Sequence, residues 1–437
     1  MNPRRVVKKL IPQALFQSIE PLGHLGEAVI VNLFNGFPAR GMNVIGVTGT
    51  NGKTTSVFLI QSMLHRAGYK VGMISTVAYG VGDDIRPQMT HMTTPSAPVL
   101  MKRIKAMKAQ GVEWLVVETT SQALAQNRVW GIPYYLVVFT NLTHEHLSYH
   151  KTFERYRAAK VRLFKIANGN ARGLRTGIVN ADDANSSYFS EAIMHSLSFG
   201  IESGDVKAEH IKNNDNDIQF DVKTGELSLH ITCRIPGTVN VYNALDAVCV
   251  GKILGLSSKQ IEQGIAAVKG VTGRMTKVDE GQDFSVVVDY AHTPDSFEWL
   301  FKDLANGKGR LIVLFGSLGG GDQEKRSLQG ALAGKYADCV VVCEEDDRLE
   351  KPEDILEAIA RGAEQAGKVR DKDLFVIHDR SKAIQFAINV ARAHDTVLLL
   401  GKGHERTIER VDGVHDWDEI SVARKALRSR SPTRLSF

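Results

Sequence analysis

Cysteine is scarce in this 437-residue chain, which has Cys233, Cys249, Cys339 and Cys343 and no Cys-x-x-Cys pair. The scattered cysteines argue against a metal or redox role, and we expect Cys339 and Cys343, which lie in a strand-like run, to be buried thiols. Long apolar runs are also missing, since none is long enough to span a bilayer. The N-terminus has neither the uninterrupted apolar core nor the small-residue cleavage site of a signal peptide. These absences predict a cytoplasmic protein.

Charge is nearly balanced, with a formal net charge of +5, and aromatic residues make up 7% of the chain. Five basic and no acidic residues lie between Arg424 and Phe437. Because no aromatic platform accompanies them, we interpret this stretch as a solvated tail and expect no nucleic-acid partner. What is present, 43% hydrophobic and 24% charged residues, is typical of a globular protein, and the length predicts two or three domains.

A glycine-rich loop, Gly-Val-Thr-Gly-Thr-Asn-Gly-Lys-Thr-Thr (46–55), separates an apolar run from a helical pattern. Gly49 and Gly52 permit close backbone approach to an anion, Lys53 adds a positive charge, and the Thr54 hydroxyl can hold Mg²⁺. The strict phosphate-loop spacing would put a glycine five residues before Gly52, where this chain has valine. An ordinary strand-to-helix turn is the alternative, but it needs the lysine and both threonines by accident. The motif predicts binding of a nucleoside triphosphate.

Short β-branched runs alternate with helical stretches from residue 43 onward, a pattern typical of an α/β protein with a parallel sheet. We expect a first group of strands at 43–47, 71–75, 114–118, 136–140 and 176–180. A hairpin is expected over 217–233, followed by helices at 239–254 and 258–268. A second group of strands, which predicts a separate Rossmann-like domain, is expected at 285–289, 311–315, 339–343, 374–377 and 396–400.

The predicted organisation has three parts, namely a short N-terminal helical segment (1–42), a central ATP-binding domain (43–271) and a C-terminal Rossmann-like domain (272–437). In the first part, basic residues at 4, 5, 8 and 9 flank an apolar pattern, and a second apolar stretch covers 22–37. Such a segment either lies on a membrane surface or packs on the central domain. We favour packing because the interfacial signature is weak, and leave weak membrane-surface association of residues 1–40 open.

Polar residues lie at or just after the ends of three predicted strands, where ligands bind in open α/β sheets: Glu118, Asn141 and Asp289. Glu118 shares a domain with the glycine-rich loop, so its carboxylate is a candidate ligand for Mg²⁺. The alternative is a carboxylate that caps the following helix.

Three histidines, His144, His146 and His150, follow Asn141. Zinc is one interpretation, but no cysteine is near, and a magnesium or substrate role for one histidine is more economical. Lys160 lies among apolar positions of a predicted helix. A lysine so placed usually extends its ammonium to solvent, so its position alone predicts no role.

Ten motifs occur in order along the chain and together resemble those of the Mur ligases. They are Gly-Thr-Asn-Gly-Lys-Thr-Thr (49–55), Thr-Thr-Pro (93–95), Glu-Thr-Thr-Ser-Gln-Ala-Leu (118–124), Phe-Thr-Asn-Leu (139–142), Ala-Lys-x-x-Leu-Phe (159–164), Asn-Ala-Asp-Asp (180–183), Asn-Val-Tyr-Asn-Ala (240–244), Gly-Arg-Met (273–275), Asp-Tyr-Ala-His-Thr-Pro-Asp (289–295) and Gly-Lys-Gly-His-Glu (401–405). The resemblance covers residues 43 to about 425. Through the last two motifs, the chain is most similar to the type that completes a muramoyl tripeptide.

The resemblance implies an ATP-dependent amide ligation in peptidoglycan precursor synthesis. The γ-phosphoryl group of ATP would pass to a muramoyl-dipeptide carboxylate, and the amine of an amino acid would attack the acyl phosphate. ATP and Mg²⁺ would be the cofactors, a muramoyl-peptide precursor and a free amino acid the partners, and the protein a monomer. Phosphorylation supplies the carboxylate with a leaving group, and catalysis then depends on positioning and charge neutralisation.

The resemblance also implies roles for individual residues. Catalysis would use Lys53, Glu118, His146 and Lys160. Magnesium would be held by Thr54, Glu118, His146 and Lys160, the last as a carbamate. ATP would be bound by Gly49, Thr50, Asn51, Gly52, Lys53, Thr54, Thr55, Asn240, Asn243, Arg274 and Asp289. Substrates would be bound by Thr93, Thr94, Ser121, Arg128, Arg326, Asp346, Arg348, Gly401 and Glu405.

The chain departs from the family pattern at three places. Only 45 residues precede Gly46, fewer than the uridine-binding domain of the family needs, so we expect weak discrimination between UDP-linked and UDP-free muramoyl peptides. Glu145 stands where the family has Asp. The family motif Asp-Asn-Pro-Arg, which selects the amino acid, reads Glu-Asp-Asp-Arg (345–348) here.

The altered motif bears on the amino acid that is added. Asp346 and Asp347 would attract a side-chain ammonium, while Arg348 and Glu405 would fix the carboxylate and amine. We therefore expect a diamino acid, with lysine preferred over meso-diaminopimelate because Asp346 would repel a second carboxylate. The alternative is a solvated acidic loop without ligand contact.

Two other functions remain open. One is a related ligase that acts on a lipid-linked or poly-glutamate carboxylate. The other is a non-catalytic ATP-binding subunit, against which the intact set of Lys53, Glu118, His146 and Lys160 argues.

Overall fold

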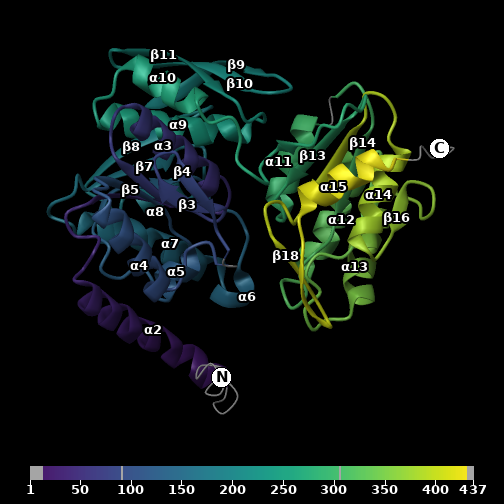
Figure 1. Ribbon diagram of the computed structural model, residues 1–437, viewed down its shortest axis with the longest axis horizontal. Helices are drawn as coiled ribbons and strands as arrows, with labels where there is room; N and C mark the ends of the chain where they lie inside the picture. The colour runs from purple at the N-terminus through teal and green to yellow at the C-terminus, as the bar shows by residue number, and fades with distance from the viewer. Residues whose placement is uncertain (1–12, 90–91, 305–306, 431–437) are drawn as a thin grey trace.

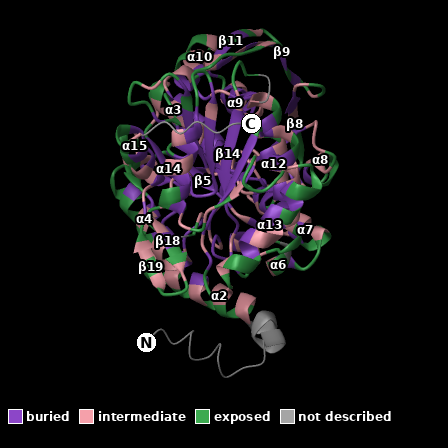
Figure 2. Cartoon of the chain, turned by 90° about the vertical axis from the view of Figure 1, so that its right-hand side faces the viewer, coloured by how far each residue is buried: buried purple, intermediate pink, exposed green. Residues whose placement is uncertain are grey.

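The computed structural model describes residues 13–89, 92–304 and 307–430. An eleven-stranded sheet and a six-stranded sheet organise it, and their domains lie side by side (Figure 1). The strands form the buried centre of each domain, and the helices around them expose their outer sides (Figure 2). All four cysteines are buried and free, and the expectation of burial is confirmed for Cys339 and Cys343.

The larger sheet is parallel in the middle and antiparallel at both edges, in the order β11-β10-β9-β8-β7-β6-β1-β5-β2-β3-β4. Its strands are β1 (Asn43–Thr48), β2 (Val71–Ile74), β3 (Ala78–Val81), β4 (Asp84–Pro87), β5 (Trp114–Glu118), β6 (Tyr134–Phe139), β7 (Thr176–Asn180), β8 (His195–Gly200), β9 (Val206–Asn213), β10 (Ile218–Thr224) and β11 (Leu227–Cys233). The predicted hairpin is confirmed as β10–β11. At the other edge, β3 and β4 add an antiparallel hairpin that was not predicted.

Helices cover both faces of this sheet, with a layer of buried apolar side chains under each. One face is covered by α3 (Lys53–Arg66), α9 (Val239–Ile253) and α10 (Ser258–Ala266). The other is covered by α4 (Ala97–Ala109), α5 (Ser121–Ala125) and α7 (Phe153–Asn168), with the shorter α6 (Leu147–His150) and α8 (Ser186–Ser190) nearby. Side-chain caps start several of these helices; at α10 the Ser257 side chain and Gln260 form a capping box. Both helices predicted after the hairpin are confirmed.

The smaller sheet confirms the predicted second Rossmann-like domain. Its order is β12-β13-β17-β14-β15-β16, and every pair except β12–β13 is parallel. The strands are β12 (Thr276–Lys277), β13 (Ser285–Asp289), β14 (Leu311–Phe315), β15 (Cys339–Val342), β16 (Leu374–Val376) and β17 (Thr396–Leu400). The helices are α11 (Pro294–Leu304), α12 (Glu324–Tyr336), α13 (Pro352–Gln365), α14 (Arg380–Val390) and α15 (Glu419–Arg428). A separate hairpin, β18 (Thr407–Arg410) and β19 (Gly413–Asp416), was not predicted.

The first described element, α2 (Gln13–Asn35), packs on α4 of the central domain. Asn32 is fully buried there and donates its side-chain amide to the Trp130 carbonyl oxygen at 2.9 Å. Packing on the central domain is therefore confirmed for α2, whereas the predicted pattern of residues 4–11 lies outside the described residues. No helix in the described part of the chain is long and apolar enough to cross a membrane.

The first part of the C-terminal basic stretch is exposed to solvent, as predicted, but it is a helix rather than a tail. Arg424 and Arg428 belong to α15, and both pair with Glu280, at 3.5 and 2.8 Å. The amphipathic helix orders these arginines because its apolar side packs on the C-terminal core. Residues 431–437 lie outside the described residues.

Candidate active site

The glycine-rich loop joins β1 to α3, and two of its glycines have positive φ angles. Gly49 has a φ of +154° and Gly52 a φ of +84°. A Cβ atom on Gly49 would lie 1.9 Å from Thr140 Oγ1, and one on Gly52 would lie 2.2 Å from Asn243 Oδ1. Both positions therefore require glycine, and the first turn of α3 lies directly against the loop, as an anion-binding site needs.

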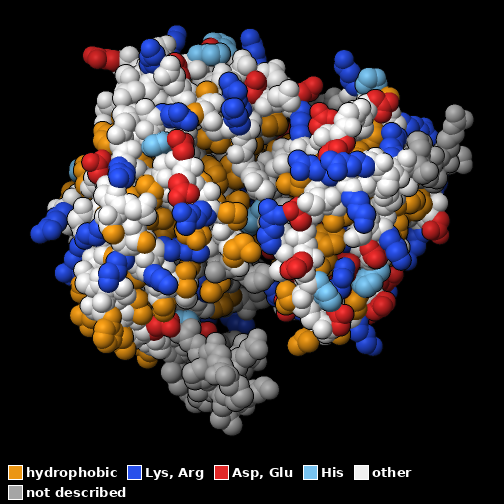
Figure 3. Space-filling view, viewed as in Figure 1, with side chains coloured by type: hydrophobic (Ala, Val, Ile, Leu, Met, Phe, Trp, Pro, Cys, Tyr) orange, Lys and Arg blue, Asp and Glu red, His pale blue; other side chains and the backbone are white. Residues whose placement is uncertain are grey.

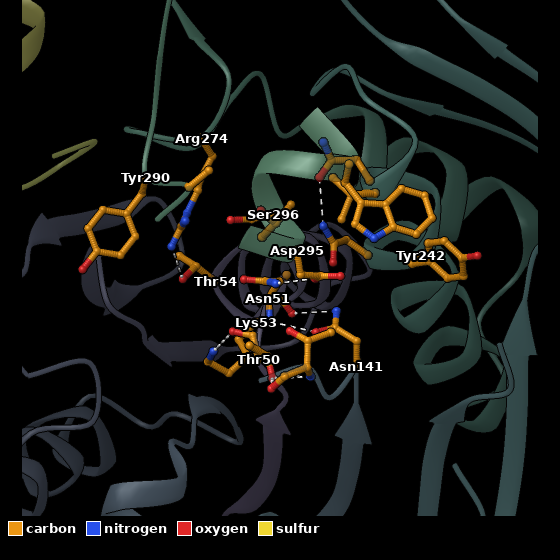
Figure 4. A pocket seen from close by; sticks show the side chains of 18 of the residues that line it. Thr50, Asn51, Lys53, Thr54, Asn141, Tyr242, Arg274, Tyr290, Asp295 and Ser296 are labelled. Carbon is orange, nitrogen blue, oxygen red and sulfur yellow. Dashed lines mark hydrogen bonds between the residues drawn. The ribbon is translucent and has the colours of Figure 1, made fainter. Parts of the chain in front are cut away.

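Residues from both domains line one cavity above this loop (Figure 4). Of the residues predicted for the site, it brings together Thr50, Asn51, Gly52, Lys53, Thr54, Thr55, Thr93, Glu118, His146, Asn240, Asn243, Arg274 and Asp289. The following predicted residues do not line it: Gly49, Thr94, Ser121, Arg128, Lys160, Arg326, Asp346, Arg348, Gly401 and Glu405.

Thr54 connects the loop to a carboxylate and to the other domain. Its hydroxyl donates to Glu118 Oε2 at 3.0 Å, and the same oxygen accepts the Thr76 backbone N–H at 2.8 Å. Arg274 reaches across from the C-terminal domain and donates through Nη2 to Thr54 Oγ1 at 3.3 Å (Figure 4). A hydroxyl and a carboxylate oxygen side by side at a phosphate-binding loop are hard oxygen donors of the kind Mg²⁺ prefers, so these residues fit that ion.

Two lysines donate hydrogen bonds to backbone carbonyl oxygens of the loop. Lys53 donates from Nζ to the Thr50 carbonyl oxygen at 2.6 Å, and Lys160 donates to the Gly49 carbonyl oxygen at 2.5 Å. Burial lowers the pKa of Lys53, against the opposing effect of Glu118. Burial, with Lys53 adding to it, lowers the pKa of Lys160 well below its usual range. The expectation that Lys160 extends to solvent is therefore wrong, since its side chain is 2% exposed.

Three polar contacts besides the Arg274 contact join the two domains around the cavity. Asn51 Nδ2 donates to Asp295 Oδ2 at 3.0 Å (Figure 4), and His292 Nε2 lies 2.9 Å from Glu145 Oε1. Burial alone would raise the pKa of Glu145, but His146, His292 and Lys53 together hold it well below its usual range. The third contact joins Thr238 to Asp303.

Sequence reasoning missed the partnership between these residues. In the sequence, Glu145 was noted only because the family has Asp at this position. His292 and Asp295 were noted only because they belong to the motif 289–295. Asn141, predicted from its place after a strand, does hold the loop: its Oδ1 accepts the Asn51 backbone N–H at 2.8 Å.

One end of the cavity carries aromatic and amide side chains. Asn243 donates to Asn240 Oδ1 at 2.8 Å, and the Tyr242 ring lies edge-on to Trp299, with the ring centroids 6.2 Å apart. Tyr242 also donates its hydroxyl to Asp182 Oδ2 at 3.0 Å. An aromatic wall with amide groups suits a flat heterocycle with ring nitrogens, such as a nucleobase. Tyr242 and Trp299 were not predicted for the site: Tyr242 was noted only as part of the motif 240–244, and nothing marks Trp299 among the other aromatic residues of the sequence.

Three of the predicted substrate-binding residues are buried behind Glu118 rather than in the cavity. Thr94 Oγ1 donates to the Glu118 carbonyl oxygen at 2.8 Å, and Arg128 donates to the Thr94 carbonyl oxygen at 3.0 Å. Ser121 Oγ lies 3.0 Å from His150 Nε2. Thr94, which Arg128 holds, thus fixes the end of β5, and contact of all three residues with substrate stays a prediction.

The three histidines do not gather as a zinc site would require. His144 stacks on Phe153, with the ring centroids 4.7 Å apart, and His150 is buried beside Ser121. Burial lowers the pKa of His150 to about 4. His146 alone lines the cavity, 3.5 Å from Glu145 Oε2, which agrees with the expectation of a role for one histidine.

Two of the predicted amino-acid-binding residues, Asp346 and Glu405, form a second cluster in the C-terminal domain, centred on Lys402. Its fully buried ammonium lies 2.9 Å from Asp346 Oδ1 and 2.5 Å from Glu405 Oε2. Tyr290, which also lines the cavity, donates its hydroxyl to Glu405 Oε1 at 3.3 Å. Gly401 has a φ of +97°, and a Cβ there would lie 2.6 Å from Glu345 Oε2. The cluster therefore adjoins the cavity through Tyr290.

Arg326 and Arg348 differ in how far they are available to a ligand. Arg326 is buried, and two of its nitrogens donate to Glu350, at 2.6 and 2.8 Å. The side chain of Arg348 is 45% exposed and lies 3.6 Å from Glu409. Asp347 is buried beside His378 and does not face the Lys402 cluster. A substrate role for Arg326 stays a prediction. The alternative of a solvated acidic loop is wrong, because Glu344, Glu345 and Asp347 are all buried.

The pair of Arg326 and Glu350 leads to a prediction about pH. Hydrogen bonds from Arg326, with the Gly320 N–H, lower the pKa of Glu350 from 4.5 to about 2. The carboxylate therefore stabilises the folded protein above its ordinary pKa, and this contribution disappears as the pH falls from 4.5 through 2. We expect Glu350→Gln to lower the free energy of unfolding at pH 7, by an amount that shrinks steadily on acidification. Urea unfolding at a series of pH values measures the difference. Glu353→Gln in the same region is the control, and a loss independent of pH would contradict the prediction.

The fold and the cavity together define a two-domain enzyme of the phosphate-loop class, in which the second domain reaches over the nucleotide site. Comparison with known proteins identifies the family to which this enzyme belongs. The protein-family model described as "Mur ligase middle domain" matches residues 47–251, and the one described as "Mur ligase, glutamate ligase domain" matches residues 273–403.

Curated relatives match over most of the chain. The UDP-N-acetylmuramyl-tripeptide synthetase of Roseiflexus sp. (strain RS-1) is 38% identical over 420 residues, 93% of this chain and 82% of the relative. The UDP-N-acetylmuramoyl-L-alanyl-D-glutamate–2,6-diaminopimelate ligase of Geobacillus thermodenitrificans is 40% identical over 408 residues, 92% of this chain and 82% of the relative. The chain belongs to the Mur ligase family, and it is an ATP-dependent ligase that forms amide bonds.

Solved structures agree with this assignment. A UDP-N-acetylmuramoyl-L-alanyl-D-glutamate–2,6-diaminopimelate ligase has a TM-score of 0.62 at 27% identity, over 94% of this chain and 83% of its own. The folylpolyglutamate synthase of Mycobacterium tuberculosis has a TM-score of 0.72 at 16% identity, over 94% of this chain and 96% of its own. At that identity the second likeness shows the fold alone.

Proposed function

We propose that the protein joins a diamino acid to the terminal carboxylate of a muramoyl dipeptide, in peptidoglycan precursor synthesis. The observation that carries the proposal is the contact of Arg274 with Thr54. It brings the C-terminal domain, with its Lys402 cluster, onto the phosphate loop of the central domain. The relatives named above, two of them 2,6-diaminopimelate ligases, support the substrate class.

The proposed reaction has two steps, and in each step one bond forms while another breaks. A carboxylate oxygen of the dipeptide attacks the γ-phosphorus of ATP, the bond to ADP breaks, and an acyl phosphate forms. The amine of the incoming amino acid then attacks the acyl carbon, loses a proton, and expels phosphate. Both steps concentrate negative charge on the phosphoryl group, so positive side chains preorganised around it lower the barrier.

The residues of the cavity suit this chemistry. Lys53 and Arg274 supply positive charge on the two sides of Thr54, one from each domain. In our proposal Mg²⁺ is held by Thr54 and Glu118, and it would neutralise phosphate charge there. The aromatic wall at Tyr242 would take the adenine.

The amino-acid subsite is proposed at the Lys402 cluster. Arg348 would hold a carboxylate of the amino acid, and Glu405 its amine. Lysine was expected to be preferred over meso-diaminopimelate because Asp346 would repel a second carboxylate. This reason does not hold, because Lys402 neutralises Asp346. The choice between these two diamino acids is therefore left to experiment.

The test is ADP release by the purified protein with ATP, Mg²⁺ and UDP-muramoyl-dipeptide, in the presence of lysine, meso-diaminopimelate or alanine. We expect release with one of the diamino acids and a product whose mass equals dipeptide plus amino acid minus water. Release that requires a poly-glutamate or lipid-linked acceptor instead would favour the related-ligase alternative. Absence of release with every acceptor, while ATP binds, would favour a non-catalytic subunit.

A further prediction concerns Asp346. Its carboxylate is one of two that neutralise the buried Lys402. We expect Asp346→Asn to lower the free energy of unfolding by about 1–3 kcal/mol, because a charged group loses part of its compensation. It should also raise the KM for the amino acid more than the KM for ATP, because Lys402 and Glu405 shift together. Urea unfolding and steady-state kinetics measure the two effects. Unchanged stability would show that Glu405 alone compensates Lys402.

We further propose that the protein works as a monomer in the cytoplasm. Both domains that line the cavity belong to one chain, so no second subunit is needed to complete it. Light scattering of the purified protein would test the oligomeric state.

A further inference from the structure

Helix α9 carries a buried acid that the proposed reaction does not use. Blue and red side chains are spread over the face of the molecule in Figure 3, where water compensates their charge. Asp246 differs, because it is fully buried on α9, and its neighbours Leu245, Ala247 and Val248 belong to the apolar core. Its Oδ1 has no hydrogen-bond partner in the described part of the chain, and its Oδ2 lies against Ser56 Oγ of α3.

The surroundings of Asp246 favour its neutral form. An ionised carboxylate without a cation beside it is strongly unfavourable in an apolar interior. No lysine, arginine or histidine side chain of the described residues pairs with Asp246. The Cys249 thiol on the same helix is kept neutral by burial, which raises its pKa well above the usual range. Burial likewise raises the pKa of Asp246 well above its usual range, against the opposing hydrogen bond with Ser56.

A neutral Asp246 sets the direction of a chain of hydrogen bonds. A carboxyl proton on Oδ2 is donated to Ser56 Oγ, so the hydroxyl hydrogen of Ser56 is available to another atom. Asn243 Oδ1 lies 3.4 Å from Ser56 Oγ and can accept it. Asn243 in turn donates to Asn240 Oδ1 at 2.8 Å, and Asn240 donates to the Pro236 carbonyl oxygen at 2.8 Å.

The direction of this chain matters because Asn240 and Asn243 both line the cavity. An ionised Asp246 would take the hydrogen of Ser56 for itself, and Asn243 Oδ1 would lose that donor. The same oxygen lies directly against the phosphate loop, 2.2 Å from the place of a Cβ atom on Gly52. The neutral acid therefore favours one orientation of the Asn243 amide, with its oxygen toward the loop and its nitrogen toward Asn240.

We propose that Asp246 is a neutral carboxylic acid that positions Asn243 and Asn240 for the nucleobase of ATP. Its proton orients the Ser56 hydroxyl, and the hydroxyl orients both amides, so their remaining N–H groups and lone pairs meet the ligand in one arrangement. Asp246 does not line the cavity, and it acts through Ser56 as a positioning residue. This role rests on the proposed place of the nucleobase at this end of the cavity.

The test compares ADP binding by calorimetry in the wild-type protein, Asp246→Asn and Asp246→Ala. The amide of Asp246→Asn can donate to Ser56 as the neutral acid does, so the dissociation constant should stay within about twofold of the wild-type value. Asp246→Ala removes the donor, and its dissociation constant should rise by about threefold to tenfold, as expected for one lost hydrogen bond. Cys249→Ala, also fully buried on α9, is the matched control and should leave ADP binding unchanged.

Infrared spectroscopy measures the protonation state itself. The difference spectrum between the wild-type protein and Asp246→Asn at neutral pH should contain the C=O stretch of a protonated carboxyl group. A spectrum with a carboxylate band in its place would overturn the proposal, and this measurement does not depend on the folding of Asp246→Ala.

Equal ADP affinity in the wild-type protein and a folded Asp246→Ala would also overturn the proposal. So would a loss in Asp246→Asn as large as that in Asp246→Ala, because the amide keeps the donor. Circular dichroism confirms that each variant folds. Failure of the wild-type protein to bind ADP would contradict the proposed function, whereas the outcomes above contradict only the role of Asp246.

Discussion

Replacing Lys160 by alanine is expected to lower the ligase rate by about 10²–10³ and to leave nucleotide binding nearly unchanged. The structure shows a fully enclosed amine, 2.5 Å from the Gly49 carbonyl oxygen and 4.5 Å from the centre of the Tyr156 ring. Because burial lowers its pKa well below the usual range, a larger share of this lysine is the neutral amine that reacts with CO₂. The resulting carbamate would carry the negative charge that a cation at the loop needs.

Chemical rescue separates this role from a structural one. Formate or acetate could enter the space left by the side chain and supply an anion, so either should partly restore Lys160→Ala. Lys165→Ala, on the exposed side of the same helix, is the matched control and should keep full activity. A crystal structure should show the carbamate directly, and calorimetry with an ATP analogue should show nearly unchanged binding. A bare ammonium directed away from the loop in a structure with Mg²⁺ and nucleotide would refute the carbamate.

Replacing Lys53 by alanine is expected to lower kcat by about 10²–10³, comparable to the loss of one preorganised donor in an active site. Its Nζ lies 2.6 Å from the Thr50 carbonyl oxygen, inside the loop that would hold the phosphates. The fold should survive, because the conformation of the loop depends on Gly49 and Gly52 rather than on this side chain. Steady-state kinetics and thermal unfolding measure the two properties.

Formate and acetate provide a contrast between the two lysines. Lys53 acts as a cation, so a carboxylate cannot replace it, and Lys53→Ala should stay inactive at concentrations that restore Lys160→Ala. Turnover close to that of the wild-type protein in Lys53→Ala would remove the loop lysine from the mechanism.

Features that depend on neighbouring residues could be predicted from the sequence. The conformation of the loop follows from glycines and a lysine within a few residues, and the alternation of strands and helices follows from local periodicity. The β3–β4 hairpin was missed because its strands have four residues each and β4 is mostly exposed, so no apolar pattern marks them. Asn141 was found because strand ends are recognisable in a sequence.

Features that join distant segments could not be predicted. The contact of Arg274 with Thr54 spans 220 residues, and that of His292 with Glu145 spans 147. The argument that Asp346 would repel a second carboxylate failed for the same cause, since Lys402, which pairs with Asp346, lies 56 residues away. Lys160 was expected to extend its ammonium to solvent. Instead it is buried and donates a hydrogen bond to the Gly49 carbonyl oxygen of the loop. Tertiary partners decide the role of a polar side chain in each case.

The polar character of the contacts between the domains affects the thermodynamics of opening the cavity. Asn51 with Asp295, Glu145 with His292, and Thr238 with Asp303 are hydrogen-bonded pairs, while each domain keeps its own apolar layers on both faces of its sheet. Apart from the ring contact of Tyr242 with Trp299, the contacts named between the domains are polar, so opening should change the heat capacity far less than unfolding does. Calorimetry of the protein without ligand should then resolve one melting transition for each domain. A nucleotide that touches both halves should merge the two transitions into one.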